Sequence, residues 1–293
     1  GDYVFCGCDN LKVVVNLSDL TFTRGSTSNG YVAYYATDYR VYNAPQGRIE
    51  SDFVLGKPND VKTLVGYLGS AKTATLPADY DGENYVIGSN AFRNRTSLAG
   101  VEIPNSVTSI EYGAFYGCTG LTSVTIPNSV TSIGSDAFAS CTSLTSVTTP
   151  NSVTSIGSGA FYNCSGLSSI EIPNSVISIG SSAFYNCSGL TSIVIPNSVT
   201  SIGGYAFYGC TKVKSVTIPN SVTSIGSSVF RDCSKLARVV IPSSVTSIGS
   251  DAFYKCSGLT SIVIPGSVAS IGDDAFYGCT KVKSVTIDRK SVV

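Results

Sequence analysis

Cysteines are the most reactive side chains of this 293-residue sequence, and eight of the ten recur every 23 residues. In proteins that are exported from the cell, so many cysteines would suggest disulfides. However, each regular cysteine follows a phenylalanine by three residues and precedes a leucine or valine by three, so all copies share one environment. Side chains stacked in parallel rarely reach the torsion of a disulfide. We therefore predict free, buried thiols that pack as small apolar groups at Cys118, Cys141, Cys164, Cys187, Cys210, Cys233, Cys256 and Cys279, with Cys8 in register.

Other reactive chemistry is scarce. The sequence has no histidine, which excludes Ser-His-Asp and Cys-His catalytic systems and histidine-bearing zinc sites. A glycosidase needs two carboxyl groups about 5–9.5 Å apart. Glu50 and Asp52 fall about 7 Å apart if they share one face of a strand, although alternate acids on a strand usually form a solvated face. We therefore expect no enzyme and no metal or cofactor site.

A 23-residue repeat positions these side chains and governs the sequence from Ile103 onward. Each copy begins with a short strand whose alternate side chains face inward, and a proline ends it. Gly134 is expected to adopt a positive φ before a short helical turn. These features predict an α/β repeat solenoid of about ten turns, in which neighbouring turns bury one another. In one copy the inward positions are Leu121, Val124, Ile126, Val130, Ile133, Ala137, Phe138 and Cys141.

The repeat also divides the chain. Residues 1–14 match the second half of one copy, and residues 15–75 do not fit the period. We expect 15–75 to form a β-rich insertion that includes a hairpin around Gly56–Asp60. Because the chain lacks methionine and starts and ends within repeats, we expect a processed product or a fragment. The predicted solenoid, 76–293, comprises a divergent copy at 76–102 with four extra residues, eight regular copies at 103–286 and a partial copy at 287–293.

The pattern L-x-x-V-x-I-P-x-x-V-x-x-I-G-x-x-A-F-x-x-C resembles the BspA-like, or Treponema-type, leucine-rich repeat. The likeness covers residues 1–14 and 76–293, and the spacing holds eight times. It implies a leucine-rich-repeat solenoid on the surface of a bacterium or protist. Several members of that family act as adhesins for host matrix or plasma proteins and for other bacteria. The family has no fixed binding motif that transfers to this sequence.

Two surfaces are candidates for contact with a partner. The first consists of outward strand residues: Ser123, Thr125, Ser146, Thr148, Ser169, Glu171, Ser192, Ser215, Thr217 and Arg238. The second is a stripe of tyrosines that each follow a core phenylalanine: Tyr116, Tyr162, Tyr185, Tyr208, Tyr254 and Tyr277, interrupted by Ala139 and Arg231. Tyrosine gives a large contact area at low entropic cost. The alternative for both surfaces is structural, as solvated strand residues and as rings that cover the turns. Ice binding by the threonine column is a distant third reading.

Charge is uneven along the array. Residues 103–194 contain no lysine or arginine, whereas residues 195–293 contain ten. Several of these cations lie just before or within strand segments, where they form either a weak patch for acidic glycans or proteins or a solvated face. They are Lys212, Lys214, Lys235, Arg238, Lys281 and Lys283.

Together these features favour an extracellular or cell-surface binding protein, adhesin-like, with protein or glycan ligands that include extracellular-matrix proteins. The alternative is a structural spacer that presents residues 15–75 or a domain outside this sequence. The net charge of zero argues against nucleic-acid binding, and the lack of a run of 18 apolar residues argues against membrane insertion. Exposed strand edges at the two ends make end-to-end association plausible.

Overall fold

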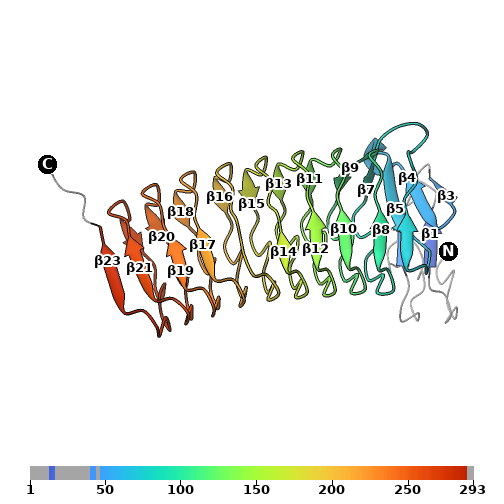
Figure 1. The fold of residues 1–293 in the computed structure, drawn as a ribbon. Coiled ribbons are helices and arrows are strands. Elements are labelled where there is room, and N and C mark those ends of the chain that lie inside the picture. The colour runs from blue at the N-terminus through green and yellow to red at the C-terminus, as the bar shows by residue number, and fades with distance from the viewer. Residues whose placement is uncertain (1–12, 17–39, 44–46, 289–293) are drawn as a thin grey trace, which may run out of the picture.

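The computed structural model describes residues 13–16, 40–43 and 47–288, so the expectations for Cys6, Cys8 and most of 1–46 lie outside the described residues. Figure 1 shows an elongated stack of turns, with the first strands at one end and β23 at the other. The described residues include no helix with the length and apolar composition needed to cross a bilayer.

One strand of each turn lies on a surface that we name the Ser-Val-Thr face. Its strands are parallel and pair residues 23 positions apart, such as Ser123 with Ser146, which matches the period of the sequence. The pairing is interrupted, so the face consists of four short sheets rather than one. The strands are β6 (Thr73–Thr75), β8 (Gly100–Glu102), β10 (Ser123–Thr125), β12 (Ser146–Thr148), β14 (Ser169–Ile170), β17 (Ser215–Thr217), β19 (Arg238–Val240), β21 (Ser261–Ile264) and β23 (Ser284–Ile287).

A second strand of each turn builds the Ser-Ile face. Here β5, β7, β9, β11, β13, β15 and β16 belong to one nine-stranded sheet that β4 and β3 complete, and β18, β20 and β22 form another. Ser132 pairs with Ser155, again 23 residues apart. The strands are β5 (Thr63–Tyr67), β7 (Tyr85–Ile87), β9 (Val107–Ile110), β11 (Ser132–Ile133), β13 (Ser155–Ile156), β15 (Ser178–Ile179), β16 (Ser201–Ile202), β18 (Ser224–Ile225), β20 (Ser247–Ile248) and β22 (Ser270–Ile271).

An antiparallel hairpin covers the N-terminal end of the Ser-Ile face. Strand β4 (Phe53–Gly56) pairs with β5 on one side and with β3 (Arg48–Glu50) on the other, which confirms the predicted hairpin. Strands β1 (Val13–Asn16) and β2 (Arg40–Asn43) form a separate parallel pair. Strand β5 pairs with β7, and β6 pairs with β8. Both faces of the solenoid therefore begin before residue 76, where the repeat becomes recognisable in the sequence.

The third side of each turn, which we name the turn side, corrects the predicted α/β class. In the described residues the only helical element is a single 3-10 turn, η1 (Pro58–Asp60), so the solenoid is mostly β. Alternate N–H groups on the turn side point in two directions. Those of Asp136, Phe138 and Ser140 donate to carbonyls of the next turn, and the intervening ones donate to the carbonyl three residues earlier. An α-helix requires every N–H to point along the chain, so the expected helical turns do not form.

The prediction of a positive φ at Gly134 is also wrong. The left-handed residues of that copy are Asp136 and Ser140, with φ of 54° and 60°. Gly134 is needed for a different reason: a Cβ there would lie 2.7 Å from the carbonyl carbon of Glu111 in the preceding turn. Glycine therefore permits close stacking of the backbones at this corner.

The core lies between the three sides, and the eight inward positions predicted for the copy at 121–141 are all buried. Aromatic rings form a continuous column along its length. Successive phenylalanines from Phe92 to Phe276 stack with centroids 4.8–5.6 Å apart. Tyr67 and Phe53 extend this column at the N-terminal end, with centroid distances of 5.1 and 5.3 Å. Each turn therefore depends on its neighbours for burial of its apolar groups.

Candidate functional site

All ten outward strand residues of the first candidate surface are exposed, and they lie on the Ser-Val-Thr face. Eight of the ten are serine or threonine, and their hydroxyl groups make no hydrogen bond to another described residue. The column beside them behaves differently, because Thr122 and Thr145 donate to carbonyls of the preceding turn at 3.0 Å. The Ser-Val-Thr columns thus present free hydroxyls at regular intervals on a rigid frame.

One predicted strand of this face is missing. Residues 191–196 form no strand, so Ser192 is exposed but does not lie in a sheet. The inward residues Ile193 and Ile195 remain buried, which shows that the turn keeps its place in the core. Val194, the outward residue between them, is 75% exposed.

The charged groups divide this face into two parts. Between residues 97 and 194 its strand segments carry two acids, Glu102 and Glu171, and no base. Between residues 212 and 286 the equivalent segments carry six bases and no acid. All six basic side chains are exposed: Lys212, Lys214, Lys235, Arg238, Lys281 and Lys283. One end of the face is therefore weakly acidic and the other is basic.

A shallow hollow of about 490 Å³ lies in the basic part, lined by residues of β19 and β21 that include Arg238, Val240 and Val263. These two strands are adjacent in the stack but are not paired in one sheet. Val240 and Val263 are 39% and 54% exposed, in a column that holds threonine or glutamate in every other turn from residue 102 to 286 except that of Val194. The site residues were found from the period alone, but nothing in the sequence indicated the opening between the strands.

The tyrosine stripe lies on the turn side, where its rings pack against one another. The rings of Tyr162, Tyr185 and Tyr208 stack with centroids 4.7 and 4.4 Å apart. Arg231 fills the interruption, with its guanidinium carbon 4.1 Å from the Tyr254 ring centroid and an ion pair to Asp251 at 2.8 Å. Because stacking covers the ring faces, the stripe offers edges and hydroxyls to solvent. Of the six predicted rings only Tyr277 is exposed, at 59%, and Tyr116, Tyr162, Tyr185, Tyr208 and Tyr254 are half-buried.

Sequence reasoning missed one member of the stripe. Arg93 lies 23 residues before Tyr116, and its guanidinium stands 4.4 Å from the centroid of that ring. The 23-residue spacing from Tyr116 marks this position in the sequence, but Arg93 lies in the divergent copy and is not a tyrosine.

An open, polar groove of about 590 Å³ runs beside the stripe, lined by Tyr185, Tyr208 and Asp232 among others. A hydrogen bond to Asp232 raises the pKa of Tyr208 to about 12, with burial as the second cause. The asparagines along this groove, Asn163 and Asn186, have positive φ. Asparagine adopts this conformation more readily than most residues, so the backbone conformation accounts for asparagine at these positions.

Comparison with known proteins agrees with this geometry. The family model of the BspA type leucine rich repeat region, which describes six copies of the repeat, matches residues 85–214 and 178–292, and together these are more than half of the chain. The chain belongs to the BspA-type leucine-rich-repeat family.

Solved structures of similar fold include other leucine-rich-repeat proteins. A leucine-rich-repeat protein of T. pallidum is 27% identical, with a TM-score of 0.55 over 81% of this chain and 91% of that one. A leucine rich cell surface protein of Faecalibacterium prausnitzii A2-165 is 26% identical, with a TM-score of 0.43 over 85% and 96%. The pneumococcal vaccine antigen PcpA is 19% identical, with a TM-score of 0.48 over 84% and 82%. A search of the curated proteins finds no match.

The cysteine column of this BspA-type chain consists of free thiols in the described residues, as predicted. Each Sγ donates to a phenylalanine carbonyl 26 residues earlier, as Cys164 does to Phe138 at 3.1 Å. Burial raises the pKa of Cys164 to about 12 and raises the pKa of Cys187 and Cys210 as well. A thiol that stays protonated is a poor nucleophile, so this column serves packing.

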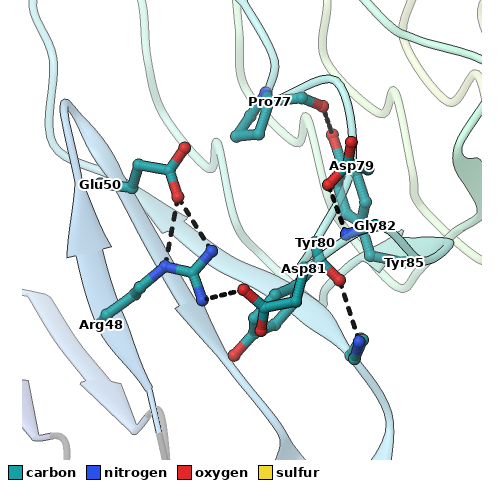
Figure 2. Close-up of polar contacts among 9 residues, drawn as sticks. Arg48, Glu50, Pro77, Asp79, Tyr80, Asp81, Gly82 and Tyr85 are labelled. Carbon is teal, nitrogen blue, oxygen red and sulfur yellow. Dashed lines mark hydrogen bonds and ion pairs between the residues drawn. The ribbon is translucent and has the colours of Figure 1, made fainter.

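The acidic pair considered for catalysis does not share a strand face. Glu50 ends β3, and Asp52 lies beyond Ser51 in the turn before β4. Figure 2 shows instead that Arg48 holds both Glu50 and Asp81, with N–O distances of 3.0 and 2.9 Å. Gly82 N–H in turn donates to Asp79 at 2.7 Å, which orders the four-residue insertion of the divergent copy. This polar cluster ties the insertion to the N-terminal hairpin.

Proposed function

We propose that this BspA-type chain is an extracellular, cell-surface binding protein that contacts macromolecules through its Ser-Val-Thr face. Its ligands would be proteins or glycans of a host or of other microbes, including extracellular-matrix proteins. Family membership supports the surface location, because the resemblance implies surface-exposed, adhesin-like proteins. The observation that carries the proposal is the row of ten exposed residues, of which the eight serines and threonines make no side-chain hydrogen bond to another described residue.

The proposed mechanism is the sum of many weak contacts over a rigid surface. The turn side commits its main chain to the stack, and the tyrosine rings largely cover one another. The Ser-Val-Thr columns instead keep their side chains available in every turn. Because the frame is rigid before binding, little conformational entropy is lost when a partner docks.

The proposal is tested by label-free binding of the chain to immobilised fibronectin, fibrinogen and arrayed glycans. A triple variant, Thr125→Glu, Thr148→Glu and Thr217→Glu, places bulk and charge along the Ser-Val-Thr face. The matched control, Thr131→Glu, Thr154→Glu and Thr223→Glu, makes the same change in exposed threonines of the same turns beside the Ser-Ile face. We expect at least one probe to bind, the first variant to weaken that binding about tenfold or more, and the control to bind normally.

The competing spacer hypothesis gives a different outcome. If the array only holds the N-terminal hairpin or another domain away from the cell, both triple variants behave like the parent chain. Binding that survives the first variant but is lost when the exposed hairpin residues Ile49 and Val61 are changed to serine would place recognition on the hairpin and contradict our proposal.

A further inference from the structure

The basic part of the Ser-Val-Thr face differs from the rest of the array in three respects that coincide in space. It carries the cations Lys214, Arg238 and Lys283 in or beside its strands. It exposes valines in two successive turns, Val240 and Val263, where most other turns place threonine or glutamate. It also contains the hollow between β19 and β21. Neither the cations nor the exposed valines are required by the repeat, because the strand segments between residues 97 and 171 carry neither a cation nor an outward valine in the threonine column, and the solenoid still forms there.

The valines identify what kind of partner suits the cations. Val240 and Val263 line the hollow together with Arg238, so an apolar group and an anionic group would be bound side by side. The core rings of the same two turns, Phe230 and Phe253, have centroids 5.5 Å apart, so the two valines lie on successive turns within reach of one partner side chain. A sulfated glycan matches the cations but offers little apolar surface to cover valines. A polypeptide with both acidic and apolar side chains matches both.

The acidic part of the same face limits where such a partner docks. Glu102 and Glu171 repel an acidic segment, and no lysine or arginine lies in the strand segments between residues 97 and 194. Long-range attraction therefore directs an anionic partner to the turns from residue 212 onward. Val194, 75% exposed, lies at the junction between the two parts and is separated from Val240 by the turn of Thr217.

Resting on the proposed function, we propose that residues 212–286 of the Ser-Val-Thr face bind an extended, acidic segment of a partner protein that also carries apolar side chains. Its carboxylates pair with Lys214, Arg238 and Lys283, and an apolar side chain occupies the hollow at Val240 and Val263.

The test uses a fluorescein-labelled 12-residue peptide of alternating glutamate and valine, followed by fluorescence anisotropy with the full chain. Two companion peptides separate the contributions: one replaces glutamate by lysine and the other replaces valine by serine. We expect the glutamate–valine peptide to bind, the glutamate–serine peptide to bind more weakly and the lysine–valine peptide not to bind. Raising the salt concentration should weaken binding, because exposed ion pairs are screened.

The variants restore residues that the array itself uses at equivalent positions, which protects the fold. Lys214→Thr with Arg238→Ser removes two cations and should weaken the peptide about fivefold. Val240→Thr with Val263→Thr removes the apolar lining and should also cost about fivefold. Glu171→Thr, the matched control in the acidic part, should leave binding unchanged or slightly tighter. Circular dichroism confirms that each variant remains folded.

Several outcomes overturn this inference. Equal binding of the lysine–valine peptide shows that charge does not select the partner. Binding of a heparin oligosaccharide without binding of the peptide assigns the basic part to a sulfated glycan. Sedimentation that shows a dimer abolished by K214T with R238S assigns it to a second copy of the chain. If the triple variant at Thr125, Thr148 and Thr217 loses its matrix ligand while K214T with R238S does not, the proposed function stands and this inference fails.

Discussion

The column of buried thiols predicts that the solenoid loses stability in mildly alkaline solution. Six of these thiols are fully buried and have a raised pKa: Cys141, Cys164, Cys187, Cys210, Cys233 and Cys256. In the unfolded chain a thiol ionises around pH 8.5, whereas in the native state burial keeps it protonated to a higher pH. The contribution of each thiol to stability is therefore fully present below pH 8.5, and it is lost as the pH rises toward the native pKa, which is about 12 for Cys164.

The size of the effect follows from proton linkage. At pH 9.5 each unfolded thiol gains about 1.4 kcal/mol from ionisation that the native thiol does not gain. Six such groups together lower the free energy of unfolding by about 8 kcal/mol relative to pH 7. That value is comparable with the whole stability of a typical domain. Because pH 9.5 lies below the ordinary pKa of tyrosine, the buried tyrosines contribute little to this loss.

Urea denaturation at pH 7.0 and 9.5, followed by circular dichroism with a reductant present, measures this loss. The control is Cys164→Ala with Cys187→Ala, which removes two titrating groups from the middle of the column. This variant starts from a lower stability at pH 7, but its loss between the two pH values should be smaller by about 3 kcal/mol. An identical loss in parent and variant would show that the thiols do not cause the pH dependence, and a loss below about 2 kcal/mol in the parent would refute the argument.

Three further changes test the stacking of the turns by urea denaturation at neutral pH. Gly157→Ala places a Cβ 2.6 Å from the backbone of Gly134 and should cost about 1–3 kcal/mol, whereas Ser158→Ala on the exposed neighbour should change stability by less than about 0.5 kcal/mol; equal effects would contradict the role of close backbone approach. Phe184→Ala interrupts the ring column between neighbours 5.4 and 5.3 Å away and should cost about 3–5 kcal/mol; a cost under about 1 kcal/mol would mean that the column is not the main core. Arg48→Ala removes ion pairs whose side chains are 42–55% exposed, so we expect a loss below about 1 kcal/mol that shrinks further at high salt.

The sequence predicted features that depend on repetition. The phenylalanine at the Phe138 position recurs in every regular copy, and the Val124 position always holds valine or isoleucine, because each turn must bury the same positions against its neighbours. This constraint made the period, the inward positions and the free thiols readable. It also located the exposed columns of the Ser-Val-Thr face, since outward strand residues alternate with inward ones.

Features that depend on contacts between turns were not readable. The expected helical turn failed because the N–H groups of Asp136 and Phe138 bond to the next turn, and local composition contains no record of that choice. The ring of Tyr67 joins the phenylalanine column from a turn in which Leu64 and Thr73 are nine residues apart, against thirteen between Ile87 and Gly100. The four extra residues before Ile87 restore the 23-residue pairing of Leu64 with Ile87. The two irregularities cancel in space but conceal the repeat in the sequence.

The three sides of the solenoid tolerate substitution differently. The proposed binding surface can therefore vary while the fold stays the same. On the turn side and in the core, a substitution disturbs a contact that both neighbouring turns share, as with Gly134 or Phe138. On the Ser-Val-Thr face the outward side chains touch no part of the frame that the stack requires, so Ser215 and Arg238 occupy equivalent positions on paired strands. Charge and apolar character can therefore change turn by turn at little cost in stability. The basic part of this face shows the result, a local surface of distinct chemistry on an otherwise uniform array.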